Sequence, residues 1–85
     1  MKSEQIVIQA EAGMHARPAG LLVKAAGAFE SKITLEKDGK TADAKRLLGI
    51  LSLAMKQGDT VTITVEGGDE EAAMEAVKEV IIEAK

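Results

Sequence analysis

The stretch TVTITVE, residues Thr60–Glu66, alternates polar and apolar side chains more regularly than any other part of the chain. A period of two predicts a β-strand with valine and isoleucine on one face and threonine on the other. Gly67-Gly68 ends this strand, and Asp69 is the expected N-cap of a helix that has acidic residues in its first turn. The apolar face of that helix follows at positions 73, 77, 80, 81 and 84.

Hydrophobic spacing predicts the remaining elements on the N-terminal side of this strand. They are a strand at Gln5–Ala10, a helix at Pro18–Phe29, strands at Lys32–Glu36 and Lys40–Ala44, and a short helix at Leu47–Met55 that is apolar at 47, 48, 50, 51 and 54 and buried on one broad face. Pro18 belongs in a first helical turn, so its helix should begin at Ala16 or Arg17. Asp38-Gly39 is typical of a two-residue hairpin.

The element order is therefore β-α-β-β-α-β-α. Because the chain has no long linker, repeat or low-complexity segment, we expect all three helices to cover one face of a four-stranded sheet, with the threonine face in water. The 85 residues are enough for one domain, 1–85, and 46% hydrophobic with 29% charged residues is a globular composition.

Composition also excludes several classes of function. The chain has no cysteine and one histidine, which excludes disulfides and leaves too few ligands for a zinc site, so no metal is expected. Neither a signal peptide nor an apolar run of about 18 residues is present, so we expect a cytoplasmic protein with no membrane insertion. The net charge of −3 argues against nucleic-acid binding. Residues 12–57, however, carry eight bases and four acids, which suits an acidic partner or a phosphoryl group.

The single histidine, His15, lies in this basic region within the segment Gly-Met-His-Ala-Arg-Pro, residues 13–18. The glycine permits a sharp exit from the first strand, and the imidazole falls where a helix begins. Free backbone N–H groups at a helix start and the Arg17 guanidinium together can hold an anion. Imidazole is a nucleophile near neutral pH, since its ordinary pKa is about 6.5. This combination favours reversible capture of a phosphoryl group.

From spacing alone, other interpretations stay open. A lone histidine near a helix start is more often a solvated or capping residue than a nucleophile. A catalytic triad would need a further base, and no P-loop or paired glycine-rich phosphate motif is present.

The segment Gly13–Ala19, Gly-Met-His-Ala-Arg-Pro-Ala, resembles the active-site signature of HPr, the histidine-containing phosphocarrier of the phosphoenolpyruvate-dependent sugar phosphotransferase system. The resemblance continues through residues 35–40, 48–53 and 67–70, which look respectively like the hairpin, the second helix and the turn into the last helix of that family. It implies an α/β (α+β) fold, an open-faced β-sandwich whose four-stranded antiparallel sheet carries three helices on one face.

The resemblance also implies a function. Phosphorylated enzyme I would transfer its phosphoryl group to Nδ1 of His15, and phospho-His15 would pass it to an enzyme IIA protein. Arg17 and the Ala16 amide would hold the phosphate. The domain would need no cofactor, would act as a monomer, and would be a carrier rather than a stand-alone enzyme. The implied docking face comprises, besides the site itself, Gly20, Lys24, Leu47, Leu48, Gly49, Leu51 and Ser52. Leu47 and Leu48 could instead complete the core.

Two positions depart from the family pattern. Arg46 stands where many relatives have a regulatory serine, and since arginine has no hydroxyl, regulation through a phosphoserine is not expected at this position. The nearest hydroxyl, Ser52, is expected to bond to a backbone carbonyl within its helix. Ala54 stands where many relatives have glycine. Three alternatives remain: a carrier of a nitrogen-branch or dihydroxyacetone pathway, a regulatory protein-binding module on the same fold, and a small-molecule-binding domain.

Overall fold

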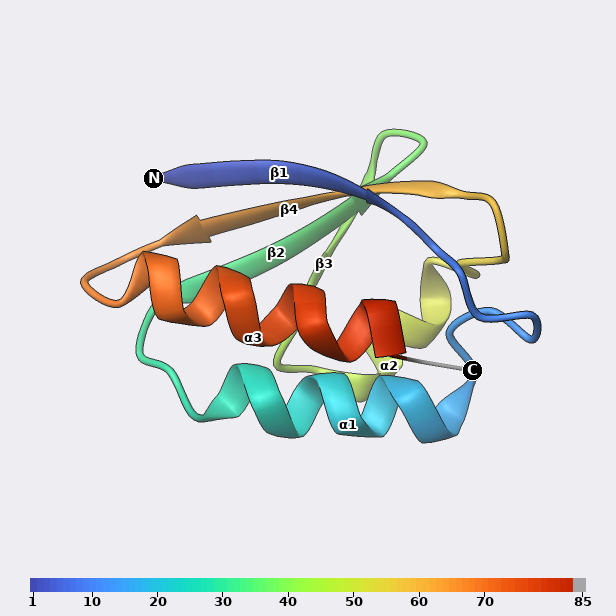
Figure 1. The fold of residues 1–85 in the computed structure, drawn as a ribbon, viewed down its shortest axis with the longest axis horizontal. Helices are drawn as coiled ribbons and strands as arrows, with labels where there is room; N and C mark the ends of the chain where they lie inside the picture. The colour runs from blue at the N-terminus through green and yellow to red at the C-terminus, as the bar shows by residue number, and fades with distance from the viewer. Residues whose placement is uncertain (84–85) are drawn as a thin grey trace.

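The computed structural model describes residues 1–83, and the helix position Ala84 lies outside the described residues. The elements are β1 (Lys2–Val7), α1 (Ala16–Gly27), β2 (Lys32–Lys37), β3 (Lys40–Asp43), α2 (Leu47–Ser52), β4 (Thr60–Glu66) and α3 (Glu70–Glu83) (Figure 1). Their order is the predicted one, and α1 begins at Ala16, one of the two predicted first residues, but it ends at Gly27 rather than at the predicted Phe29. The structure confirms the open-faced α+β architecture.

The sheet is antiparallel throughout, in the order β1-β4-β2-β3, with all three helices on one face (Figure 1). The strand at Thr60–Glu66 is β4, and it lies between β1 and β2. Its Val61, Ile63 and Val65 are completely buried beneath the helices. Thr62 and Thr64 lie on the open face and are half-buried. The alternation that predicted this strand therefore also identifies its two environments.

The β2–β3 hairpin turns at Asp38-Gly39, as predicted. Asp38 has φ 51° and Gly39 has φ 80°, so both residues are in the left-handed region. Two consecutive residues of this kind match the right-handed twist of the adjoining strands, which is why Asp-Gly is a strong hairpin sequence.

The first strand differs from the prediction of Gln5–Ala10. β1 begins at Lys2, where its pairing with β4 starts, and Glu4 within it faces the helices and forms an ion pair of 2.8 Å with Lys78 of α3. A charged side chain at this position hides the strand from a hydrophobic pattern. Ile8 and Ala10 are buried as predicted, but they follow the strand, where the Ile8 amide donates to the Asp59 carbonyl at 2.9 Å.

The second helix is shorter than the predicted Leu47–Met55. It ends at Ser52, and within it only Ile50 is fully buried, so the prediction of one broad buried face is wrong. Leu53 still has right-handed backbone angles, whereas Ala54 has φ 51° and reverses the chain. Leu53 and Met55 are buried after the helix has ended. Their apolar character reflects packing of a turn, which periodicity could not distinguish from a longer helix.

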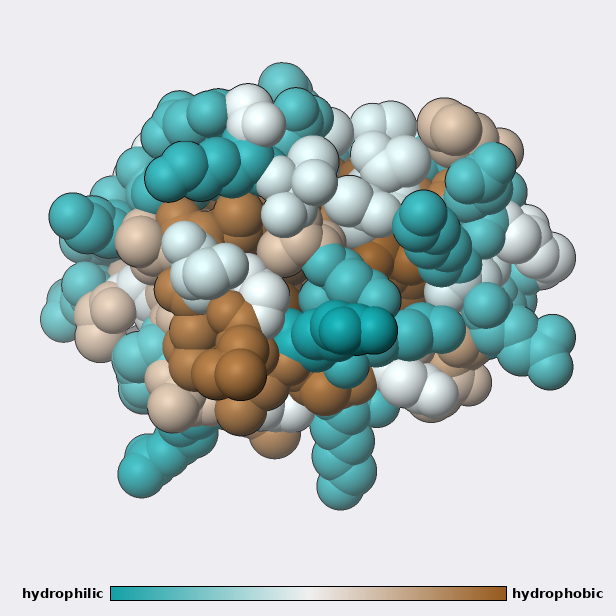
Figure 2. Space-filling model, turned by 180° about the vertical axis from the view of Figure 1, so that it is seen from behind, coloured by the Kyte–Doolittle hydropathy of each residue, from teal (hydrophilic) through white to brown (hydrophobic). Residues whose placement is uncertain are grey.

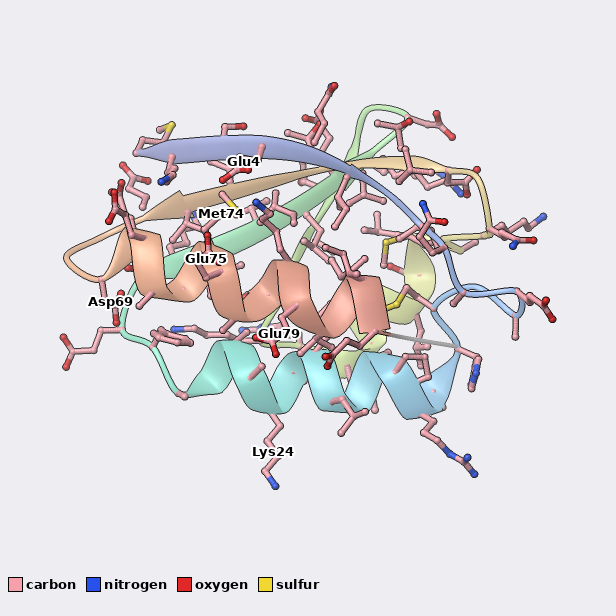
Figure 3. The ribbon with its side chains drawn as sticks, viewed as in Figure 1. Glu4, Lys24, Asp69, Met74, Glu75 and Glu79 are labelled. Atoms are coloured by element: carbon pink, nitrogen blue, oxygen red, sulfur yellow. The ribbon has the colours of Figure 1, made fainter. Side chains whose placement is uncertain are left out.

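Asp69 directly precedes α3, as predicted, but its carboxylate serves another segment. It accepts hydrogen bonds from the amides of Glu30 and Ser31, each at 3.1 Å, and from the Ser31 hydroxyl. Asp69 therefore joins the β4–α3 turn to the α1–β2 turn (Figure 3). A capping pattern in the sequence predicts only bonds within the first turn of the helix. It could not predict this contact, because Ser31 and Asp69 lie 38 positions apart.

Candidate functional site

His15 is the N-cap residue of α1, and its backbone is extended, with φ −80° and ψ −171°. Its carbonyl accepts the first bond of the helix, from the Ala19 amide at 3.0 Å. The imidazole is exposed and makes no capping hydrogen bond. The side-chain capping interpretation of His15 is therefore wrong, and neither ring nitrogen has a hydrogen-bond partner among the described residues.

The first turn of α1 offers donors beside this ring. In the part of the chain that the structure describes, no acceptor is bonded to the backbone N–H groups of Ala16 and Arg17. Pro18 has no N–H, so these two amides are the open ones at the helix start. The Arg17 side chain is exposed and adds a guanidinium. Two amides at the positive end of a 12-residue helix and a nearby cation are groups that can hold an anion.

The loop that delivers His15 is held by a segment far away in the sequence. The Met14 amide donates to the Met55 carbonyl at 3.0 Å, and the Gly13 amide donates to the Ala10 carbonyl at 2.9 Å. Gly13 has φ 70°, and a Cβ atom there would overlap the Met55 carbonyl oxygen. The glycine is thus required both for its backbone conformation and for this close approach. Sequence reasoning anticipated the turn but missed Met55.

Leu47 and Leu48 lie at the start of α2, with 39% and 81% of their surfaces exposed. They do not complete the core, so that interpretation is wrong, and the docking role stays a prediction. Figure 2 shows the apolar surface that gathers on the face carrying α2, with hydrophilic atoms beside it. Lys24 points from α1 into solvent (Figure 3). An exposed apolar patch with cations nearby suits a partner that is apolar at its centre and acidic at its rim.

The other predicted docking residues differ in accessibility. Gly20 and Gly49 are half-buried, and Leu51 packs against the core. The Ser52 hydroxyl donates to the Gly49 carbonyl at 2.7 Å, the backbone bond predicted for it. Among these residues, Ser52 is exposed, whereas Gly20, Gly49 and Leu51 are only partly accessible to a partner.

Arg46 is the N-cap residue of α2, and it makes no side-chain capping bond. It is 82% exposed, and its Nε lies 3.9 Å from Asp43 Oδ2. An exposed pair at this distance contributes little to stability. The guanidinium therefore adds positive charge next to Leu47 without serving the helix.

Sequence reasoning missed Leu21, which is 57% exposed on α1. It lines an open groove of about 620 Å³ between α1 and α3, together with Pro18, Lys24, Ala25, Val80 and Glu83. Leu21 lies outside the apolar helical face that the spacing predicts. A large apolar residue at a position predicted to be exposed is the signal that could have identified it.

Among the described residues, no helix has both the length and the apolar character needed to cross a membrane.

Comparison with known proteins places this geometry in a family. Residues 2–83 match the family model described as "PTS HPr component phosphorylation site". The chain is 46% identical over 77 residues to the HPr-like protein Crh of Halalkalibacterium halodurans, covering 91% of this chain and 92% of the relative. The chain belongs to the HPr family of phosphocarrier proteins.

Two solved structures support this assignment. HPr of Thermoanaerobacter tengcongensis has a TM-score of 0.92 and 45% identity, covering 96% of this chain and 92% of the other. Crh of Bacillus subtilis has a TM-score of 0.79 and 38% identity, covering 100% and 98%, and its crystal structure is described as a dimer with a swapped domain. Since HPr of Thermoanaerobacter tengcongensis has also been solved as a dimer, both relatives are described as dimers, and the monomeric state expected from the sequence stays a prediction.

Proposed function

We propose that this protein carries a phosphoryl group on His15, accepting it from phosphorylated enzyme I and donating it to an enzyme IIA protein in phosphoenolpyruvate-dependent sugar uptake. The observation that carries this proposal is the free imidazole at the start of α1, next to two open amides and Arg17. Membership of the HPr family supports it.

In the transfer, the lone pair of His15 Nδ1 forms a bond to phosphorus while the bond between phosphorus and the donor atom of enzyme I breaks. The electron pair of the broken bond stays on that donor. The proton of the neutral imidazole remains on Nε2, so no net proton transfer is needed. The Ala16 and Arg17 amides and the guanidinium stabilise the charge on the three transferring oxygens. The onward transfer reverses these roles, with Nδ1 as the leaving atom.

Leu47 and Leu48 give the partners a surface to recognise next to the reacting nitrogen. A carrier must be released by one partner before the next can bind it. A small apolar contact with charges around it suits this role, because it binds weakly and associates quickly. We assign these two leucines to the docking face, together with Ala16, Arg17, Gly20, Lys24, Gly49, Leu51 and Ser52.

A second candidate is a regulatory protein-binding module on the same fold. The similarity to Crh favours it, because the Bacillus subtilis relative is described as a catabolite repression protein. In such a module the leucine patch would bind a partner whether or not His15 is present. Binding of a partner that is unchanged in His15→Ala would support this alternative.

The test is the intact mass of the protein after incubation with enzyme I, magnesium and phosphoenolpyruvate, beside a His15→Ala control. One acid-labile phosphoryl group on the parent and none on the control would support the proposal. Running enzyme I of the sugar branch in parallel with enzyme I of the nitrogen branch identifies the pathway. A folded parent protein that neither enzyme modifies would contradict the carrier function and favour the binding module.

A further inference from the structure

Lys37, the last residue of β2, has a mostly buried side chain that is 13% exposed. Its ammonium lies 3.2 Å from the Leu53 carbonyl, 2.8 Å from the Ala54 carbonyl and 2.9 Å from Asp59 Oδ2. An ammonium has three donors, and here each has an acceptor. Two of the acceptors are carbonyls at the end of α2, where the helix leaves carbonyls unpaired and its dipole is negative.

Asp59 completes the arrangement from the other end of the same turn. Its Oδ2 also accepts the Lys56 amide at 2.8 Å. The hydrogen bond from Lys37 and the bond from the Lys56 amide lower the pKa of this carboxyl below its ordinary value. The Asp59 carbonyl accepts the Ile8 amide at 2.9 Å, which fixes the turn to the chain just after β1. Residues 53–59 are therefore held at both ends.

The middle of this segment supports the site. The Met55 carbonyl lies between these two anchors, and it accepts the amide of Met14, the residue before His15. A shift of Leu53, Ala54 or Asp59 would move the Met55 carbonyl. The His15 loop would then lose the bond that positions it against the rest of the fold.

We infer that Lys37 and Asp59 are positioning residues for the reaction at His15: they fix the segment 53–59, whose Met55 carbonyl orients the loop that carries the imidazole. This inference rests on the proposed function. Neither residue touches the phosphoryl group, so both act through Met55 and Met14. Misplacement of a reacting group by about 1 Å can lower a reaction rate by up to about 100-fold. Residues that do not touch the phosphoryl group, such as Lys37 and Asp59, can therefore affect the rate of transfer.

The test compares Lys37→Met with Lys32→Met, a matched control on the same strand whose exposed lysine makes no hydrogen bond or ion pair among the described residues. Transfer from phosphorylated enzyme I should show a kcat about 10-fold lower in Lys37→Met with KM within about twofold, because the docking leucines are unchanged. Hydrogen exchange of the Met14 amide, measured by NMR, should be about 10-fold faster. Lys32→Met should match the parent in both measurements.

If Lys37→Met does not fold, Asp59→Asn replaces it, with the same direction of both effects expected. A folded variant with the kcat of the parent would overturn the inference, and so would a lower kcat with unchanged Met14 exchange. Normal phosphorylation of the parent with no effect in either variant refutes this inference alone. A folded parent that no enzyme I phosphorylates refutes the proposed function, and with it the reaction that these residues would serve.

Discussion

At one end of the molecule the β4–α3 turn meets the α1–β2 turn, and at the other end the start of α1 meets the turn after α2 (Figure 1). At the first end, the Asp69 carboxylate is bonded to two amides and to the hydroxyl of Ser31, which is only 2% exposed. At the second end, His15 and the Ala16 and Arg17 amides have no such partners among the described residues.

The difference shows how one small fold separates stability from function. Polar groups that bond to one another stabilise a turn, and they have no remaining capacity for a ligand. Donors at an exposed helix start can be left without a protein partner at little cost, because water solvates them, and they stay available to a ligand. Substitutions at each end test whether stability and transfer are as separate as the hydrogen bonds at the two ends indicate.

The largest effects are expected at two glycines, one at each end. A Cβ at Gly67, where φ is 151°, would lie 2.8 Å from Ser31 Cα, and a Cβ at Gly13 would overlap the Met55 carbonyl. Each alanine variant should lower the free energy of unfolding by about 3 kcal/mol, measured by urea denaturation. Only Gly13→Ala should also slow phosphoryl transfer, by up to about 100-fold in its folded fraction.

Gly27→Ala is the control, because Gly27 ends α1 with open space around its Cα. It should leave the transfer rate of the parent intact and should not destabilise the protein, because alanine is a better helix former than glycine. Equal slowing of transfer by Gly67→Ala and Gly13→Ala would show that the two ends are coupled after all.

Arg17→Ala should slow transfer from enzyme I about 100-fold, because removal of one donor from a developing anion typically costs this much. The free energy of unfolding should change by less than about 0.5 kcal/mol, since the side chain is exposed. Rapid-quench kinetics and chemical denaturation measure the two quantities. An unchanged transfer rate would remove Arg17 from the site.

Leu48→Glu should raise the KM of enzyme I for this protein about 10-fold with kcat nearly unchanged, because a charge in the apolar patch opposes docking. Leu47→Glu should act in the same direction, although Leu47 offers less surface. Val7→Glu, an exposed apolar position paired with Thr60 on the open face of the sheet, is the control. A KM that rises equally in Val7→Glu would mean that general charge repulsion, not docking, is measured.

The hydrogen bonds of the Asp69 carboxylate should make the thermal stability of the protein depend on pH. The Ser31 hydroxyl, followed by the amides of Glu30 and Ser31, lowers the pKa of Asp69 from its ordinary 3.8. The folded state thus favours the ionised carboxyl, and this stabilisation is present above the unfolded pKa and lost as pH falls through the folded one. The Tm should fall between about pH 5 and pH 2.

Asp69→Asn should have a lower Tm at neutral pH and a shallower decline on acidification. The pairs Glu4–Lys78 and Asp59–Lys37 should leave part of the acid dependence in place, since both carboxyls also have lowered pKa values. If the Tm of Asp69→Asn falls with pH as steeply as that of the parent, Asp69 does not contribute to the acid dependence of stability.

The smallest effect is expected at Ala54, whose φ of 51° is unfavourable for a residue with a Cβ. Ala54→Gly should raise the free energy of unfolding by about 1 kcal/mol. Ala28→Gly is the matched control, because Ala28 follows α1 with a right-handed φ of −75°, and glycine there should not stabilise. Stabilisation by both substitutions would exclude relief of strain as the cause.

Much of this protein could be predicted from its residues alone. Alternation in Thr60–Glu66, the Asp38-Gly39 turn and the position of Pro18 each predicted an element correctly, because these signals are local and concern the backbone itself. The single histidine at a helix start likewise marked the candidate site before its surroundings were known.

Tertiary structure decided what depends on contacts between distant segments. Glu4 of β1 forms an ion pair with Lys78 of α3, and Asp69 bonds to a turn 38 residues away. Lys37 reaches the carbonyls after α2, and Met55 holds the loop before His15. A sequence pattern reports which face a residue prefers, whereas the partner of a buried charge or an amide is chosen only when the folded chain brings the two together.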